Sequence, residues 1–549
     1  MHRPTHLHRA RTESFDVCVI GGGATGAGVA LDATLRGLRV CLIEREDFSA
    51  QTSSKSTKLI HGGVRYLEQA FKKLDWEQFR LVRKALRERR YLLRNAPHLT
   101  RPLALLTPCA SWFERFYYGT GLKLYDALAG NDNLAPSRQL SSAEALECIP
   151  TLRREHLRGA VLYYDGQLDD ARFGLALVKT AARRGTTVLN HACALDFGTS
   201  SNGQLQTLTV QDELTGERLV VTARLFVNAA GPFADAVRLR ANPRLAERMR
   251  VSKGVHLILP RTVLDGDTAV LVPKTDDGRV IFLIPWQEHV LVGTTDTEAH
   301  LHDDPTLNQA EVAYLLDYVR RYLDVTVSPA QVQAGFAGLR PLLQADPLAS
   351  AKSLVRDHEV EVDAVSGLVS IMGGKWTTYR LMAQDTVDEC LRQLGEAPRP
   401  CQTAGQLLAG AEGFTPEGWR QLSPLPEDVA RHLWKKYGTE SQAIVALIHQ
   451  RPDLAERLDE GLPFLAAEVI FAVETEMACT LPDVLGRRLG LELLDWAATL
   501  RALPAVTGLM AGVLGWTEGE IQRAAQAYRH RIENERELAA SGQNQKCTA

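Results

Sequence analysis

Residues 16–44 read DVCVIGGGATGAGVALDATLRGLRVCLIE. An apolar run precedes Gly21-x-Gly23-x-x-Gly26, a helix-like segment follows it, and a second apolar run ends in Glu44. This order predicts a βαβ unit that binds a dinucleotide. Gly21 permits a tight turn, Gly23 lets the backbone approach a pyrophosphate, and Gly26 lets the helix pack close to the strand.

The same unit offers further cofactor contacts. Ala24 and Thr25 lie in the first helical turn, where unpaired N–H groups and the helix dipole favour phosphate. The carboxylate of Glu44 is expected to accept hydrogen bonds from a ribose. The hydroxyl-rich segment that follows fits either a set of pyrophosphate ligands or a flexible polar loop, and its candidate residues are Ser53, Ser54 and Ser56.

Composition bounds the class of protein. The 549 residues suffice for three or four domains of about 150 residues each, and the 45% hydrophobic content supports sizeable cores. The net charge of −3 excludes a globally basic nucleic-acid binder. The nine cysteines form no C-x-x-C pair, so no metal site or dithiol motif is predicted, and a reducing compartment is indicated.

The first 14 residues are polar and basic and lack an apolar core region, so they do not read as a secretory signal. We expect a disordered tail there, carrying His2, His6 and His8. We find no run of about 18 apolar residues, so no membrane-spanning helix is predicted.

The order of strand-like and helix-like segments predicts an α/β protein of three domains. Residues 159–164 and 186–189 are expected to return to a parallel sheet around a helix at 170–184, whereas short alternating runs in 251–300 indicate an antiparallel sheet. We predict a discontinuous Rossmann-like nucleotide-binding domain, an inserted mixed or antiparallel-sheet substrate domain and a C-terminal helical domain. Their expected boundaries are 14–95, 158–245 and 350–395 for the first, 96–157 and 246–349 for the second, and 400–540 for the third.

Four strings follow the glycine fingerprint in order: SSKSTKLIHGGVRYL at 53–67, NAAGPFAD at 228–235, FAGLRPL at 336–342 and GGKWTTYR at 373–380. Together they resemble the FAD-dependent glycerol-3-phosphate dehydrogenase family, within the D-amino-acid-oxidase-like flavoproteins. Residues 472–491 also resemble the helical domain of that family. The first string is similar to the mitochondrial branch, but the sequence shows no D-x-D-x-D-G loop, so calcium control is not implied.

The resemblance implies FAD as cofactor and oxidation of sn-glycerol 3-phosphate to dihydroxyacetone phosphate. Hydride is expected to pass from carbon 2 to flavin N5, and the electrons then to a membrane quinone. Two alternatives stay open. One is an oxidase of the same fold that uses oxygen and acts on glycerol phosphate or an amino acid. The other is a nucleotide-binding scaffold without turnover.

Arginines are expected to hold the substrate, because a phosphate ester brings about −1.5 to −2 charges and a guanidinium binds it through two hydrogen bonds. The resemblance places Arg65 and Arg356 at the phosphate, with Tyr66 also at the substrate. It places Arg340 nearer the reacting hydroxyl.

The catalytic base is expected to be His61 or His256, since histidine titrates near neutral pH. Each histidine also has an alternative role. His256 could be a hydrogen-bonded residue of a strand, and His61 could lie against the flavin ring and orient it. Lys375 is expected to stabilise negative charge on the reduced ring, although Thr377 also fits a simple helix cap. The other residues that the resemblance assigns to the cofactor are Lys58, Gly231, Gly374, Trp376 and Thr377.

Two segments are candidates for a membrane contact. Residues 71–94 hold nine Lys or Arg against three acidic residues, which fits a basic amphipathic helix on lipid or a helix packed on the core. Residues 111–128 are rich in aromatics, which fits a membrane interface or a buried domain contact. The expected location is cytoplasmic and peripheral on the inner face of the plasma membrane, and a homodimer is possible.

Overall fold

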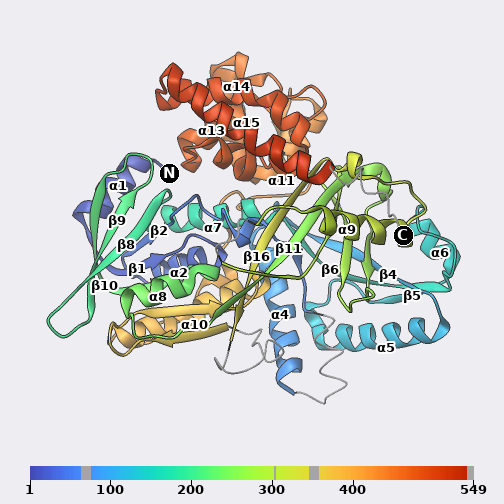
Figure 1. Ribbon diagram of the computed structural model, residues 1–549, viewed down its shortest axis with the longest axis horizontal. Helices are drawn as coiled ribbons and strands as arrows, with labels where there is room; N and C mark the ends of the chain where they lie inside the picture. Colours follow the sequence, from blue (N-terminus) through green and yellow to red (C-terminus); the bar gives the residue numbers. More distant parts are fainter. Residues whose placement is uncertain (64–75, 302–304, 345–357, 541–549) are drawn as a thin grey trace, which may run out of the picture.

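The computed structural model describes residues 1–63, 76–301, 305–344 and 358–540. Two large β-sheets lie side by side and helices cover them, while a separate group of helices packs across their upper side (Figure 1). The architecture is mixed α/β with a C-terminal helical domain, as the sequence predicts.

The first sheet is built from strands that are far apart in the sequence. Its order is β17-β18-β10-β1-β2-β7, and every neighbouring pair from β18 to β7 is parallel. The antiparallel strand β17 closes one edge, and the β8–β9 ribbon joins β10. The bounds are β1 (Ser14–Ile20), β2 (Val40–Ile43), β7 (Thr187–Leu189), β8 (Ala192–Thr199), β9 (Leu205–Asp212), β10 (Arg218–Asn228), β17 (His358–Val362) and β18 (Val369–Gly373).

Strand β1 is apolar and buried from Val17 to Ile20 because both of its faces are covered there. Val17 and Val19 point into a core shared with α2 (Ala24–Leu35), α7 (Asp170–Arg183) and α10 (Tyr379–Gln393), which pack together on one face. Cys18 and Ile20 point into a second core shared with β8 and β9. Continuous apolar strands are typical of a parallel sheet that is buried on both sides.

The second sheet is largely antiparallel and has the order β15-β11-β14-β13-β12-β4-β6-β3, with β16 added on β11 and β5 on β6. The expected antiparallel sheet in 251–300 is confirmed by the registers of β11, β13 and β14. The bounds are β3 (Leu59–Ile60), β4 (Thr100–Cys109), β5 (Arg138–Leu140), β6 (Gly159–Leu168), β11 (Met249–Pro260), β12 (Ala269–Val272), β13 (Ile281–Trp286), β14 (His289–Gly293), β15 (Thr297–Ala299) and β16 (Ala334–Leu343).

One strand assignment was wrong. Residues 159–164 do not return to the parallel sheet, because β6 pairs antiparallel with β4 in the second sheet. Only residues 187–189, as β7, rejoin the parallel sheet. Strand β6 is buried along nearly its whole length, and a continuous apolar run does not distinguish parallel from antiparallel pairing.

The N-terminal residues form helix α1 (Arg3–Thr12), not a disordered tail. The Met1 ammonium donates to the carbonyl of Thr475 at 2.6 Å, and Arg3 pairs with Asp212 at 2.9 Å. His6 is buried, and its Nδ1 accepts a hydrogen bond from Val188 N. These partners lie far away in the sequence, so the polar composition of the segment does not reveal them.

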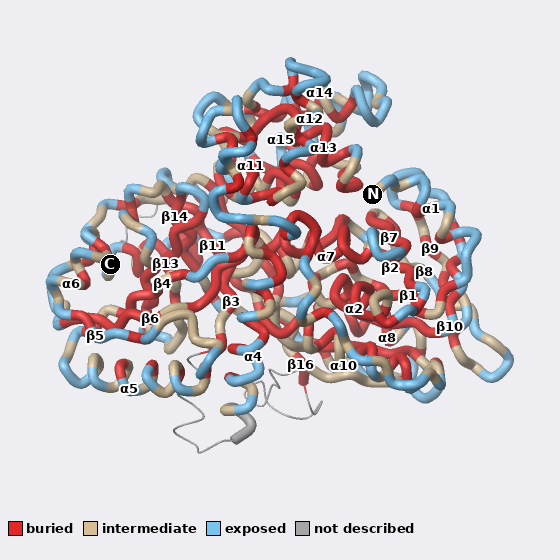
Figure 2. The backbone as a smooth tube through the Cα atoms, turned by 180° about the vertical axis from the view of Figure 1, so that it is seen from behind, coloured by how far each residue is buried: buried red, intermediate tan, exposed pale blue. Residues whose placement is uncertain are grey.

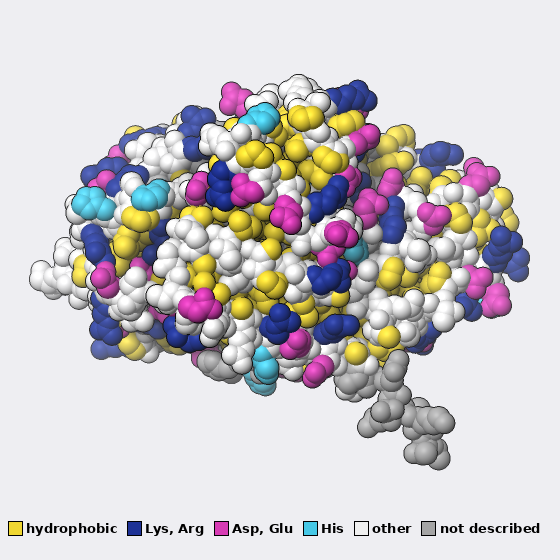
Figure 3. All heavy atoms as spheres, turned by 90° about the horizontal axis from the view of Figure 1, so that it is seen from above, with side chains coloured by type: hydrophobic (Ala, Val, Ile, Leu, Met, Phe, Trp, Pro, Cys, Tyr) yellow, Lys and Arg dark blue, Asp and Glu magenta, His cyan; other side chains and the backbone are white. Residues whose placement is uncertain are grey.

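The C-terminal domain contains α11 (Glu427–Tyr437), α12 (Ser441–Gln450), α13 (Ala466–Glu476), α14 (Trp496–Leu514) and α15 (Glu518–Ala540). On the face seen in Figure 3, basic and acidic side chains are interspersed. Among the described residues, α14 alone is long and apolar enough to cross a bilayer, which the sequence analysis missed. Its inner residues are buried against α13 and α15, so its apolar composition is explained by core packing.

Helices α4 (Trp76–Asn95) and α5 (Trp112–Ala129) border the second sheet on the opposite side of the molecule from the C-terminal domain (Figure 1). Val82, Leu86 and Leu92 of α4 are buried, so its apolar stripe faces the core. Figure 2 shows buried and exposed residues alternating along α5. Other helices are α6 (Ser142–Cys148), α8 (Ala234–Ala241) and α9 (Gln309–Tyr322).

Candidate active site

A cavity of about 1710 Å³ runs from the glycine turn after β1 to the second sheet and α5. Most of the predicted site residues that the structure describes lie in its wall. Those lining residues are Gly21, Gly23, Ala24, Thr25, Glu44, Ser53, Ser56, His61, Gly231, His256, Arg340, Gly374, Lys375, Trp376 and Thr377.

The turn between β1 and α2 leaves room for a phosphate but not for side chains. Gly21 has φ +110°, and a Cβ there would lie 2.5 Å from the carbonyl oxygen of Ala229. A Cβ on Gly26 would lie 1.8 Å from Gly21 O, so Gly26 acts in helix packing and not in the cavity wall. The turn therefore fits the pyrophosphate of a dinucleotide.

Glu44 lies in the wall beside this turn. Its carboxylate accepts hydrogen bonds from Gly22 N at 2.6 Å and Glu46 N at 2.9 Å, and burial raises its pKa. Nearby, the guanidinium of Arg45 lies 4.7 Å from the ring centre of Phe233. Each carboxylate oxygen has more than one acceptor site, so Glu44 retains capacity for ribose hydroxyls.

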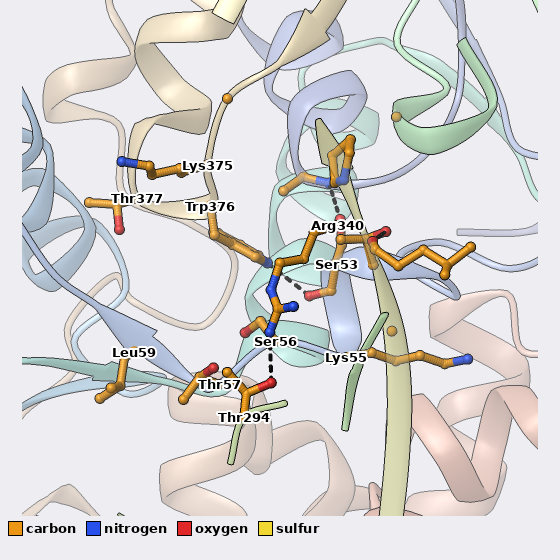
Figure 4. A pocket seen from close by; sticks show the side chains of 18 of the residues that line it. Ser53, Lys55, Ser56, Thr57, Leu59, Thr294, Arg340, Lys375, Trp376 and Thr377 are labelled. Carbon is orange, nitrogen blue, oxygen red and sulfur yellow. Dashed lines mark hydrogen bonds between the residues drawn. The ribbon is translucent and has the colours of Figure 1, made fainter. Parts of the chain in front are cut away.

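The hydroxyl-rich loop is packed in place by both domains. Ser53 Oγ accepts from Ala24 N at 3.0 Å, and Ser53 O accepts from the Trp376 indole at 2.8 Å. Thr52 donates to Leu339 O at 2.6 Å (Figure 4 shows the loop around Ser53 and Thr57). These contacts oppose the flexible-loop alternative.

The structure gives Lys58 and Ser54 structural roles. The buried ammonium of Lys58 pairs with Asp170 and donates to Ser54 O at 2.7 Å. Ser56 also donates to Asp170, at 2.7 Å. Of the described residues predicted to contact the cofactor, Lys58 and Ser54 thus lie outside the cavity wall, as Gly26 does, whereas Ser56 lies in it.

Arg340 enters the cavity from β16. Its Nη2 atom donates to Thr294 Oγ1 at 2.7 Å (Figure 4). Nη2 also donates to Thr295 O at 2.9 Å, and Nη1 lies 3.1 Å from Asp296. A Cβ on Gly254 would lie 2.3 Å from Nη2. The neighbouring strand therefore needs glycine at that position to admit the guanidinium.

Both candidate bases are neutral imidazoles near neutral pH. Burial, then the charge of Lys375, lowers the pKa of His61 to about 4. Burial, then Arg340 and Lys58, holds the pKa of His256 well below its usual value. His256 is packed on Phe336 with ring centres 4.9 Å apart, and its Nε2 is 3.0 Å from Thr57 Oγ1. His61 is less deeply buried and lines the same cavity.

The turn at Lys375 also lines the cavity. Gly373 and Gly374 have φ values of +72° and +83° before a short helical turn that leads into α10. His61 N donates to Thr377 Oγ1 at 3.3 Å. Thr377 therefore binds the His61 backbone, and the structure records no capping bond from it to the helix.

Three predicted substrate residues, Arg65, Tyr66 and Arg356, lie outside the described residues. Three residues were missed by the sequence analysis. Thr57 belongs to the hydroxyl-rich string and was detectable there, whereas Thr294 and Asp296 follow β14 and gain their role only because Arg340 lies opposite them.

Comparisons with known proteins agree with this geometry. Residues 16–380 match the family described as FAD dependent oxidoreductase, and residues 401–521 match the C-terminal domain of alpha-glycerophosphate oxidase. The mitochondrial glycerol-3-phosphate dehydrogenase of Homo sapiens is 40% identical over 532 residues, covering 94% of this chain and 73% of its own. Its counterpart in Arabidopsis thaliana is 41% identical, and the match covers 93% of this chain and 86% of the plant protein.

Solved structures show the same relationship. The glycerol-3-phosphate dehydrogenase from Bacillus halodurans, solved with FAD, has a TM-score of 0.80 and 31% identity and covers 99% of both chains. The alpha-glycerophosphate oxidase of Mycoplasma pneumoniae, at 16% identity and a TM-score of 0.56, shares the fold over 72% of this chain. FAD is thus the cofactor for which the glycine turn and cavity are built. The chain belongs to the FAD-dependent glycerol-3-phosphate dehydrogenase family.

Proposed function

We propose that this protein oxidises sn-glycerol 3-phosphate to dihydroxyacetone phosphate. The observation that carries the proposal is that one cavity joins the dinucleotide turn to Arg340 and two neutral histidines. FAD, when bound, supplies the hydride acceptor for the carbon 2 hydrogen of the substrate. The names of the relatives support glycerol 3-phosphate as substrate.

The side chains of the chain bind the substrate and move its proton. Arg340, held by Thr294 and Asp296, presents a fixed positive charge to the anionic substrate. We assign proton acceptance to His61, because His256 is more deeply buried and its Nε2 already contacts Thr57. Lys375 contributes positive charge beside the cofactor.

We further propose a membrane quinone as electron acceptor. The outer side of α5 carries Trp112, Phe113 and Phe116, which are 69%, 75% and 68% exposed. The same helix contributes apolar residues to the cavity wall, and those residues are Phe116, Tyr117, Tyr118, Leu122 and Leu124. An apolar path from the surface to the flavin site suits a lipid-soluble acceptor.

Neighbouring charges support a bilayer as the docking surface. Helix α4 lies against α5 and exposes a row of basic side chains, namely Arg80, Arg83, Lys84, Arg87 and Arg90. Aromatic residues beside basic ones favour an anionic membrane interface. We propose that the protein lies on the cytoplasmic, inner face of the plasma membrane; a homodimer stays a prediction.

The decisive experiment is anaerobic addition of glycerol 3-phosphate to the purified yellow protein. Bleaching of the flavin is expected, followed by reoxidation when a soluble quinone is added. A flavin whose colour persists would refute the substrate assignment. Rapid reoxidation by oxygen with peroxide release, and none by quinone, would instead favour an oxidase.

A further inference from the structure

Asp47 occupies an unusual place in the cofactor-binding segment. It lies between two residues that bind the backbone of Gly22. The carboxylate of Glu44 accepts a hydrogen bond from Gly22 N, and the N–H of Ser49 donates to Gly22 O at 3.0 Å. The carbonyl of Asp47 itself accepts from Ala50 N at 3.0 Å. The side chain of Asp47 is fully buried. Any movement of Asp47 would therefore be transmitted to the glycine turn from both sides.

Two of the three residues that donate side-chain hydrogen bonds to the Asp47 carboxylate come from the C-terminal domain. Arg488 donates to both of its oxygens, at 2.5 and 2.9 Å, and Arg487 Nε donates at 2.6 Å. Asn190, at the end of β7, adds a fourth bond at 3.0 Å. The two arginines lie in the helical turn Asp483–Arg488, more than 400 residues away in the chain.

A metal ion is not needed to explain this cluster. Asp47, His191 and Asp483 bring possible ligand atoms within 4.8 Å of one another. Asp47 is already neutralised by two guanidiniums, and Asp483 pairs with Arg487 at 2.7 Å and with His191 at 2.9 Å. Its charges are thus balanced by side chains alone.

We infer that Arg487 and Arg488 of the C-terminal domain are positioning residues for FAD, because through Asp47 they hold the segment 44–50 against the glycine turn. Loss of either arginine leaves a buried carboxylate incompletely paired, which is strongly unfavourable. The segment then shifts toward water, and Glu44 and Gly22 lose their alignment. The helical domain thereby governs how long the cofactor stays bound.

A second ion cluster in the same interface offers a matched control. Lys179 on α7 donates to Glu476 and to Glu440, each at 2.7 Å, and is as deeply buried as the Asp47 cluster. The side chains of this cluster link α7 to the C-terminal domain without contacting residues 44–50, and the backbone carbonyl of Glu476 accepts from Arg488 at 2.8 Å independently of Lys179. Removing its charge should therefore weaken the interface but leave the cofactor segment in place.

The test compares Arg488→Met with Lys179→Met as purified holoproteins. FAD release after dilution is followed by the recovery of flavin fluorescence, and the thermal midpoint of each variant is measured in parallel. We expect Arg488→Met to release FAD at least tenfold faster than the parent. The release rate of Lys179→Met should stay within twofold of the parental rate, although both variants should lower the thermal midpoint by similar amounts.

An unchanged release rate in Arg488→Met, or equal acceleration in both variants, would overturn the inference. Should Arg488→Met fail to yield folded protein, Arg487→Gln removes one of the bonds to Asp47 and keeps the other guanidinium. That variant is expected to release FAD about threefold faster. Release at the parental rate would again overturn the inference.

Discussion

The Nη2 atom of Arg340 lies 2.7 Å from Thr294 Oγ1. The contact joins β16 to the segment after β14, and both border β11 in the second sheet. The guanidinium that we propose as a substrate contact is thus held in place by the protein itself, which reduces the entropy lost on binding.

Replacing Arg340 with Ala should abolish anaerobic bleaching by glycerol 3-phosphate while the protein stays yellow. Arg340 lies on β16 in the second sheet and not in the dinucleotide turn, so its loss should spare cofactor binding. Stopped-flow absorbance with saturating substrate measures the rate of flavin reduction, and we expect this rate to fall by at least about 100-fold. Arg340→Lys should recover only part of it, because lysine cannot make the same pair of contacts. Reduction at the parental rate would exclude the proposed role.

Gly254→Ala should displace the Arg340 guanidinium without removing it. The added Cβ would lie 2.3 Å from Nη2, so the arginine must move. We expect a KM raised about tenfold or more, with flavin content unchanged. Gly508→Ala is the control, because a Cβ there meets no atom within 4 Å. A KM equal in both variants would argue against a substrate contact by Arg340.

The reductive step should be insensitive to pH where an ordinary histidine titrates. With a pKa of about 4, His61 stays neutral and able to accept a proton down to that value, so the rate at saturating substrate should fall only as pH drops toward 4. His61→Gln should slow the step about 100-fold or more. A half-maximal rate near pH 6.5 in the parent would show that another group is the base.

Exchange of Trp112, Phe113 and Phe116 for Ser should detach the protein from anionic vesicles. These side chains are largely exposed, so the substitutions should leave the thermal midpoint within a few degrees of the parent. Co-sedimentation at low salt measures binding. Bleaching by substrate should persist, because Arg340 and His61, to which we assign the substrate and its proton, are unchanged. Undiminished sedimentation of the triple variant would move the membrane contact elsewhere.

Local features of the fold were predictable where the backbone conformation or the packing permits only one type of residue. Gly21 must adopt φ +110° and Gly26 must admit a backbone oxygen, so the fingerprint could be read directly. The alternation in 251–300 likewise revealed the antiparallel sheet. Strand β6 was misplaced because burial on both faces removes the alternation that identifies an antiparallel strand.

Many of the residues that line the cavity were predictable from the sequence, but the contacts between them were not. His256 and Phe336 pair across β11 and β16 although 80 positions separate them, and nothing in either string reveals that register. Lys58 lies in a string that resembles a cofactor-binding segment, yet its ammonium forms an ion pair with Asp170. The pairing of Asp47 with Arg488 is equally invisible, since each partner is an ordinary charged residue in its own segment.

The interleaved order of the first sheet has a consequence for biosynthesis. β1 emerges early from the ribosome, but its partner β10 ends at Asn228, and β18 and the two arginines that hold Asp47 follow much later. β1 can pair early with β2, but its other edge stays unpaired in the nascent chain until β10 has been made, a state prone to aggregation. Overproduction should depend on chaperone supply and on flavin present as translation finishes.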